Sequence, residues 1–262
     1  MKTSDVLAAM EKLVAPLTLS EQFCKKYGAY DNSGIILDSG EQVKGILFCL
    51  DLTPAAVKKA KSLGCNLIFT HHPAIFGGIK SVICQPQSPT AALGECMRAG
   101  MSVISMHLNF DAAPQGIDYY LMRALGGEKE LALLNPLECG GYGRIYNVQP
   151  QTFAEFSARA VSQLSTQRAR FYDSGRKVER VASFCGAGCD EESIAFAIDG
   201  GADTFVSSDM KHHHIATLLN AGLNIVELTH YSAEIYGLAR IYDQTNAKLG
   251  VVSHFFTEEC ML

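Results

Sequence analysis

The sequence contains no apolar run long enough to cross a bilayer, because a membrane-spanning helix needs about 20 consecutive apolar residues. The segment that follows Met1 lacks the cationic start and the long apolar core of a signal peptide, so we expect none. A basic stripe is missing too, and the formal net charge is −5, so no nucleic-acid footprint is indicated. These absences indicate neither a nucleic acid nor a membrane as a partner.

No Cys-x-x-Cys pair occurs. The nine cysteines are scattered, and several stand within apolar segments, where a reduced cysteine behaves as a small hydrophobic residue. Cys185 and Cys189 flank Gly186-Ala187-Gly188, which indicates a loop rather than a zinc knuckle. We therefore expect reduced thiols, as in the cytoplasm.

A Walker-type phosphate-binding loop is also absent. The nearest candidate is Gly186-Ala187-Gly188, which follows a predicted strand and opens a predicted helix. Such a loop can cradle an anion at the N-terminus of the helix. A tight turn between strand and helix is the other interpretation of the same glycines.

What the sequence does contain is an alternation of short apolar strands and amphipathic helices over 262 residues, of which 48% are apolar and 19% charged. This length suits one large domain or two small, closely packed ones. The alternation predicts an α/β fold in which mixed, mostly parallel sheets are flanked by helices. The Gly-rich stretch 126–143 is weakly periodic, and we place the boundary between two lobes there.

The two halves of the chain share one order of elements. Segments 43–70 and 178–207 each contain a strand, a turn, a helix, a glycine and a short strand. Each half then continues through a helix, Ala-Gly and a strand to a histidine that a carboxylate follows four residues later. The first copy ends in His107 and Asp111, and the second ends in His230 and Glu234. Two matches in the same order predict a duplicated αβ unit.

The most distinctive motif is His71-His72-Pro73, which follows the predicted strand 67–69. Open α/β folds bind their ligands outside the carboxyl ends of the strands, and a proline biases the residue before it to an extended conformation. The second half has Ser208 and Asp209 at the equivalent position. For the motif alone, two histidines held in a turn by hydrogen bonds are the alternative interpretation.

The strand ends of both halves together offer six metal ligands. Neutral imidazole plus carboxylate suits Zn, Fe, Mn and similar divalent ions, and the absence of thiolates disfavours a closed structural zinc site. Two carboxylates can bridge a pair of ions, which two-metal hydrolytic sites hold about 3.5–4 Å apart. The candidate ligands are His71, His72, His107, Asp111, His230 and Glu234.

A further histidine cluster, His212-His213-His214, stands at the start of a predicted helix. Three successive residues of a helix point in different directions, so they cannot all bind one ion. We interpret His212 and His214 as part of a solvated helix start. Asp209 and His213 are four residues apart and could orient the metal ligands through hydrogen bonds.

These motifs, in this order, resemble those of the NIF-three-like family with a dinuclear metal centre, whose members are often labelled GTP cyclohydrolase 1 type 2 homologues. The resemblance covers nearly the whole chain. The family often has Trp where Tyr30 stands and an apolar residue where Ser33 stands, which leaves the ligand set unchanged. The matching segments are 30–34, 67–76, 107–111, 186–188, 209–213 and 230–234.

The resemblance implies two interleaved αβ repeats. We divide them into a first lobe of residues 1–126 plus 225–262, which carries most of the metal ligands and the returning C-terminal segment, and a second lobe of residues 127–224. The resemblance also implies a toroidal homohexamer whose metal sites face an internal cavity. It also implies two divalent metal ions per subunit (Zn, Fe, Mn, Ni or Mg), with His107 close by and five ligands: His71, His72, Asp111, His230 and Glu234.

Two functions are compatible with this set of residues. The first is a metal-dependent hydrolase, and the family label would make a nucleotide such as GTP its substrate. Glu234 is then the better bridging ligand because its side chain reaches further than that of Asp111, and His107 is the candidate for proton transfer. The second is a non-enzymatic protein that stores, delivers or senses metal with the same dinuclear site.

Overall fold

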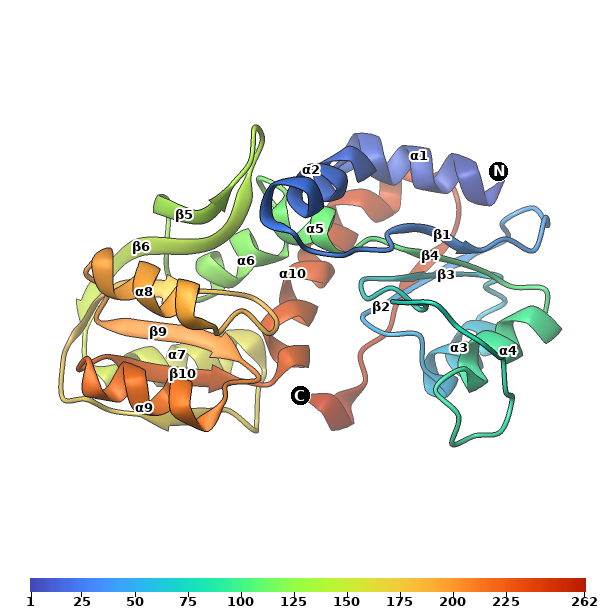
Figure 1. The fold of residues 1–262 in the computed structure, drawn as a ribbon. Helices are drawn as coiled ribbons and strands as arrows, with labels where there is room; N and C mark the ends of the chain where they lie inside the picture. The colour runs from blue at the N-terminus through green and yellow to red at the C-terminus, as the bar shows by residue number, and fades with distance from the viewer. The chain divides into compact units, whose positions relative to one another are not determined.

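The computed structural model describes all 262 residues, and the chain divides into two compact units, which are described separately (Figure 1). The first unit comprises residues 1–110 and 238–258, and the second comprises residues 111–237 and 259–262. Two helices, α5 (Leu108–Ala112) and α10 (His230–Thr245), begin in one unit and end in the other. None of the helices combines the length and the apolar character that crossing a membrane requires.

The first unit is built on a five-stranded sheet with the order β1-β4-β3-β2-β11. β1 is antiparallel to β4, and all the other neighbouring strands are parallel. β2, β3 and β4 are buried along their whole length, as strands covered on both faces must be. The strands are β1 (Gly34–Leu37), β2 (Ile46–Cys49), β3 (Leu67–Thr70), β4 (Ser102–Ser105) and β11 (Ser253–Phe255).

Helices cover both faces of this sheet (Figure 1). α3 (Pro54–Ser62) and α4 (Ala91–Arg98) pack on one face, where Leu47, Ile68 and Val103 form part of an apolar cluster. α3 begins as the sequence predicts, because Thr53 accepts a hydrogen bond from the Ala56 amide at 3.1 Å and proline is the first helical residue. The remaining helices of this unit are α1 (Thr3–Leu13), α2 (Leu17–Tyr27) and the short η1 (Asn246–Lys248).

The second unit contains a six-stranded sheet with the order β5-β6-β8-β9-β10-β7. Its central strands β8, β9 and β10 are parallel, whereas β5, β6 and β7 pair with their neighbours in the antiparallel direction. The strands are β5 (Glu130–Pro136), β6 (Gly141–Gln151), β7 (Arg170–Tyr172), β8 (Val178–Ser183), β9 (Thr204–Ser208) and β10 (Asn224–Leu228).

One face of the second sheet is covered by α8 (Glu191–Asp199) and α9 (His212–Asn220). Their buried side chains join Phe205 and Ile225 of the sheet in one apolar cluster. The unit also contains α6 (Ile117–Ala124), α7 (Phe153–Leu164) and the short η2 (Glu259–Met261). α6 packs against β6 and β8.

The predicted α/β fold with a duplicated unit is confirmed. The order β2-α3-β3-α4-β4 in the first unit is repeated as β8-α8-β9-α9-β10 in the second, and in both copies the three strands are parallel neighbours. Because the carboxyl ends of parallel strands meet at one edge of a sheet, each copy presents an equivalent set of strand ends.

The division of the chain differs from the expected one. The units separate at residues 110/111 and 237/238 rather than at 126/127 and 224/225. The reason is that α6 packs on the second sheet and that β10 pairs with β9 and β7 in that sheet. The Gly-rich stretch 126–143 is not a linker, because it contains β5 and the start of β6, which pair as a hairpin. α2 and β7 were not predicted.

Candidate metal centre

In the first unit, three histidines gather at the carboxyl ends of β3 and β4. His71 and His72 follow β3 directly, and His107 follows β4 after one residue. Atoms that can bind a metal lie within 4.8 Å of one another in all three side chains. The ring centroid of His71 is 4.8 Å from that of His72 and 5.1 Å from that of His107.

Each of these imidazoles is held through its Nδ1 atom. An oxygen acceptor at this position requires the hydrogen to be on Nδ1, which leaves Nε2 with the lone pair that a metal needs. His71 is fully buried, and the others are partly exposed. The acceptors are the carbonyl oxygen of Met106 for His71 at 3.0 Å, Asp51 for His72 at 2.7 Å and Asp31 for His107 at 3.0 Å.

Asp31, the acceptor for His107, is itself held by several hydrogen bonds. Burial raises its pKa, but hydrogen bonds from His107, Ser20 and Ser33 outweigh this effect and lower the pKa of Asp31 to about 2. Ser33 donates to its carboxylate at 2.6 Å and also accepts the backbone N–H of His107 at 2.9 Å. Asp31 therefore remains an anion at neutral pH and can stabilise a positive charge on His107.

The second unit carries the other candidate ligands. Asp111 lies on α5 and Glu234 on α10, and both are buried, with exposed fractions of 5% and 2%. His230 begins α10, and its Nε2 is 3.2 Å from Glu234 Oε1, one helical turn away. The Nδ1 of His230 is 2.6 Å from Asp209, which is the same anchoring arrangement as in the first unit.

Gly186 packs directly against this pair of ligands. It has a φ of +60°, and a Cβ atom on it would lie 2.5 Å from Glu234 Oε1 and 3.3 Å from His230 Nε2. Its carbonyl oxygen accepts hydrogen bonds from Ser207 and Ser208 at 3.3 and 2.5 Å. The glycine of this loop thus allows the backbone to approach the ligands closely, in a conformation that other residues rarely adopt.

Cys185, the preceding residue, forms hydrogen bonds with two carboxylates of this unit, Asp111 and Asp118. Its thiol donates a hydrogen bond to Asp111 at 3.4 Å, and its backbone N–H donates to Asp118 at 3.1 Å. Burial, followed by the charges of Asp111, Asp118 and Glu234, raises the pKa of the Cys185 thiol. Cys185 therefore stays a neutral thiol beside the two carboxylates.

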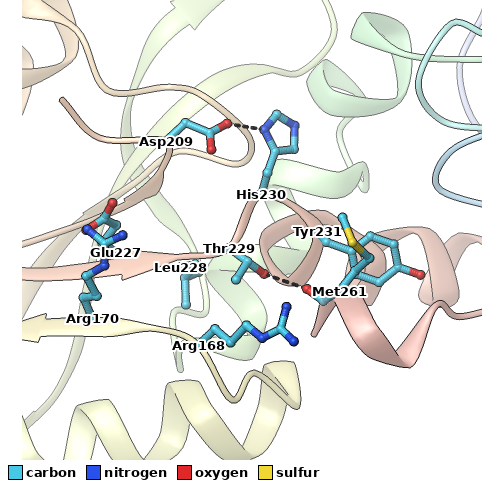
Figure 2. Close-up of a pocket in the computed structure, with 9 residues that line it drawn as sticks. All are labelled: Arg168, Arg170, Asp209, Glu227, Leu228, Thr229, His230, Tyr231 and Met261. Carbon is cyan, nitrogen blue, oxygen red and sulfur yellow. Dashed lines mark hydrogen bonds and ion pairs between the residues drawn. The ribbon is translucent and has the colours of Figure 1, made fainter. Parts of the chain in front are cut away.

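A pocket of about 350 Å³ opens beside His230 (Figure 2). Two of its charged residues, on the neighbouring strands β7 and β10, form a pair, since Arg170 lies 3.3 Å from Glu227. Arg168 forms no ion pair, and Figure 2 shows it on the side of the pocket away from Asp209 and His230. The lining is completed by Leu228, Thr229, Tyr231 and Met261.

Asp209 orients His230 through a hydrogen bond, as expected from the sequence. His213, which was expected to orient a ligand in the same way, lies beside His214 and Glu191 instead. The interpretation of His214 as solvated was wrong, since only 2% of it is exposed. Sequence reasoning also missed the two other carboxylate anchors, Asp31 and Asp51. Their only signal was a position in a turn or just after a strand, where aspartate is common.

Comparisons with known proteins show which family the chain resembles. The profile of Duf34/NIF3 (NGG1p interacting factor 3) matches residues 1–260. A protein of Clostridium perfringens named GTP cyclohydrolase 1 type 2 homolog is 27% identical over 254 residues, covering 95% of this chain and 93% of its own. One of Campylobacter jejuni with the same name is 28% identical over 238 residues, covering 90% and 88%.

Solved structures show the same fold. The Staphylococcus aureus hypothetical protein SA1388 superposes with a TM-score of 0.83 at 24% identity, covering 99% of this chain and 97% of its own. Reduced HcgD from Methanocaldococcus jannaschii gives a TM-score of 0.80 at 24% identity, with 97% of both chains covered. Because the family profile spans almost every residue, the chain belongs to the Duf34/NIF3 family.

Proposed function

We propose that this chain is a dinuclear divalent-metal-binding protein that acts as a metal-dependent hydrolase. The observation that carries the proposal is the anchoring of each histidine ligand through Nδ1 to a carboxylate or a backbone carbonyl, which is the usual support of a metal-binding imidazole. The proposed ligands are His71 and His72 in the first unit and Asp111, His230 and Glu234 in the second.

The donor set fits a pair of divalent ions. It consists of imidazole nitrogens and carboxylate oxygens, which suit Zn, Fe, Mn or Ni, and its carboxylates suit Mg. Cys185 lies beside the carboxylates of the second unit, but the raised pKa of its thiol disfavours the thiolate that a metal would require. The set therefore matches a hydrolytic pair better than a closed structural zinc site.

In the proposed reaction, bound metal would supply a nucleophile at neutral pH by lowering the pKa of water. Asp51 and Asp209 hold the rings of His72 and His230 so that Nε2 keeps its lone pair. His107 would transfer the proton at its own Nε2, because Asp31 occupies its Nδ1 and stabilises the imidazolium that forms.

The pocket beside His230 supports a small anionic substrate. Its volume of about 350 Å³ lies at the lower end of the range of small-molecule sites. Arg168 can pair with a phosphate or carboxylate group, since no residue of the chain neutralises it in the structure. A nucleotide such as GTP, the substrate in the names of the curated relatives, is a substrate of this class.

The proposal is tested by two substitutions measured side by side. Asp111→Ala should remove most of the bound metal, while circular dichroism shows that the fold survives. His107→Ala should retain the metal and lose about 10²–10⁴-fold in rate, as expected for a general acid–base group. Elemental analysis of the purified proteins and hydrolysis of a nucleotide panel provide the readouts. Unchanged metal content in Asp111→Ala would refute the ligand assignment.

We also propose that the chain assembles as a homohexamer, on the strength of the family resemblance. Size exclusion with light scattering should give a mass of about six times the 28.4 kDa chain. A monomer at micromolar concentration would refute this assembly and leave the metal proposal untouched.

Metal handling without catalysis is the second candidate function. It is favoured by an additional group of residues that could hold a metal ion, Glu191, His213 and His214, which a hydrolase with a dinuclear site does not need. A catalytic pair should retain its ions through turnover, whereas a carrier should release them to a metal-free acceptor. Transfer of labelled metal to a chelator column separates the two functions.

A further inference from the structure

The start of α9 carries a group of side chains that lies outside the proposed dinuclear site. His213 and His214 are the second and third residues of this helix, and Glu191 is the first residue of α8. The metal-binding atoms of these three side chains lie within 4.8 Å of one another. All three belong to the second unit.

His214 is an unusual residue for a purely structural role. Only 2% of it is exposed, yet its Nδ1 atom has no hydrogen-bond partner. Its Nε2 faces Glu191 Oε1 at 3.4 Å. The nitrogen that faces the other members of the group is Nε2, and it is this buried atom that can bind an ion.

The distance between His214 and Glu191 distinguishes two kinds of contact. A charge-assisted hydrogen bond between such groups would be about 2.7–2.9 Å long. Two ligands of one tetrahedral zinc ion, with bonds of about 2.0–2.1 Å, lie about 3.3–3.4 Å apart. The observed 3.4 Å matches the edge of a metal coordination shell and is too long for a strong direct bond.

His213 is placed to supply the third ligand. Its ring centroid is 4.3 Å from that of His214, and the two rings are inclined by 72°. Its side chain is exposed, so an ion bound there can exchange with solvent. α9 has no side-chain cap at its start, so no competing hydrogen bond at this helix end has to be broken.

Two features oppose a cation at this place. The N-termini of α8 and α9 carry partial positive charge, and Lys211 is close enough to influence Glu191. Three side chains can bind the ion, whereas one ammonium group, that of Lys211, repels it. The balance favours a site that binds metal more weakly than a dinuclear centre and releases it more readily.

We propose that Glu191, His213 and His214 form a separate, solvent-accessible site for one divalent transition-metal ion such as Zn²⁺, with water completing the coordination. The site is connected by sequence to the proposed dinuclear centre, because Asp209, which anchors His230, is four residues before His213. An ion held by His213 would therefore restrain the segment that positions His230.

The test uses the full-length protein, stripped of metal and titrated with Co²⁺ and then with Zn²⁺ against a chromophoric chelator. Wild type should show one ion more than His213→Gln or Glu191→Gln, together with the visible absorption of tetrahedral cobalt. Each substitution should lower the affinity for this ion by about 100-fold or more, because even residues that only hydrogen-bond to a metal ligand contribute about 10–100-fold to metal affinity. His212→Gln, in the same helical turn but outside the group, is the matched control and should leave binding unchanged.

The same titration in an Asp111→Ala background separates this site from the dinuclear centre. If both proposals hold, the background loses most of its metal and retains the ion that depends on His213. If only the dinuclear proposal fails, Asp111→Ala changes nothing, and the ion that depends on His213 is still observed. Equal metal content and affinity in wild type, His213→Gln and Glu191→Gln, or equal losses in His212→Gln, would overturn the inference.

Discussion

Replacing Gly186 by alanine tests how closely the backbone supports the proposed ligands. The new Cβ would lie 2.5 Å from Glu234 Oε1, whereas real Cβ atoms essentially never approach other heavy atoms within 3.0 Å. The carboxylate or the loop must therefore move by about 0.5 Å, which exceeds the ±0.2 Å that metal–ligand distances tolerate. Glu234 is 2% exposed and has little room in which to move.

The substitution also strains the backbone, and this effect has to be separated from the displacement of Glu234. A residue with a side chain in the left-handed region costs about 1–2 kcal/mol, which corresponds to a decrease in Tm of about 2–8 °C in a chain of this size. Gly222 has a φ of +76°, and a Cβ atom added to it would meet no other atom within 4 Å, so Gly222→Ala carries the strain without the contact. It lies in the same unit and is the matched control.

We expect Gly222→Ala to lose a few degrees of Tm and no metal. Gly186→Ala should lose at least as much in Tm and should bind metal about 10–100-fold more weakly, by analogy with substitutions of residues that support a ligand. Competition with a fluorescent zinc chelator measures the affinity, and calorimetry measures Tm. Equal metal affinity in the two variants would show that Glu234 does not depend on the close approach of Gly186, and the reasoning would fail.

The remaining predictions concern stability. The pKa of Asp31 is lowered from 3.8 to about 2, so its ionised form contributes about 2 kcal/mol to the free energy of unfolding above pH 4. This contribution should be lost as the pH falls towards 2. The free energies of unfolding of metal-free wild type and Asp31→Asn, measured in urea, should therefore converge in acid. Arg144→Leu should destabilise the protein by about 3–5 kcal/mol, because it leaves the fully buried Asp118 without the partner 3.1 Å away. Arg170→Leu should cost less than Arg144→Leu, because the side chain of Arg170 is 69% exposed.

Much of the fold could be predicted because the sequence marks the starts of helices and the lengths of strands clearly. Thr53 and Pro54 mark the start of α3, and the apolar runs of β2, β3 and β4 are too short to be helices. The β5–β6 hairpin was missed because its glycines, among them Gly143 with a φ of +70°, suggested a linker. In the structure Gly143 lies in β6, which pairs with β5, and local periodicity in the sequence does not reveal such pairing.

The histidines of the candidate site could be singled out because they follow predicted strands, and Asp209 was expected to orient them, whereas the anchors Asp31 and Asp51 were not predicted. Asp31 and Asp51 are ordinary residues of a turn or a strand end until the fold brings them to the Nδ1 atoms of His107 and His72, which are 76 and 21 residues away in sequence. An acceptor that acts over such separations leaves no local pattern. Only the pairing of strands makes the relationship visible.

The duplication explains why the two units contribute differently. After β3 the first copy places His72, whereas after β9 the second copy places Asp209 at the equivalent position. In the second unit this carboxylate anchors His230, the histidine that follows the next strand, β10. In the first unit the equivalent position is taken by a candidate ligand, so the histidine after β4, His107, obtains its anchor from Asp31, which precedes β1. Because β1 pairs with β4, it can deliver that carboxylate to the same strand end. The same strand-end position thus carries a candidate ligand in one copy and an anchor in the other, and β1, the additional strand beside β4, supplies the anchor that the first copy would otherwise lack.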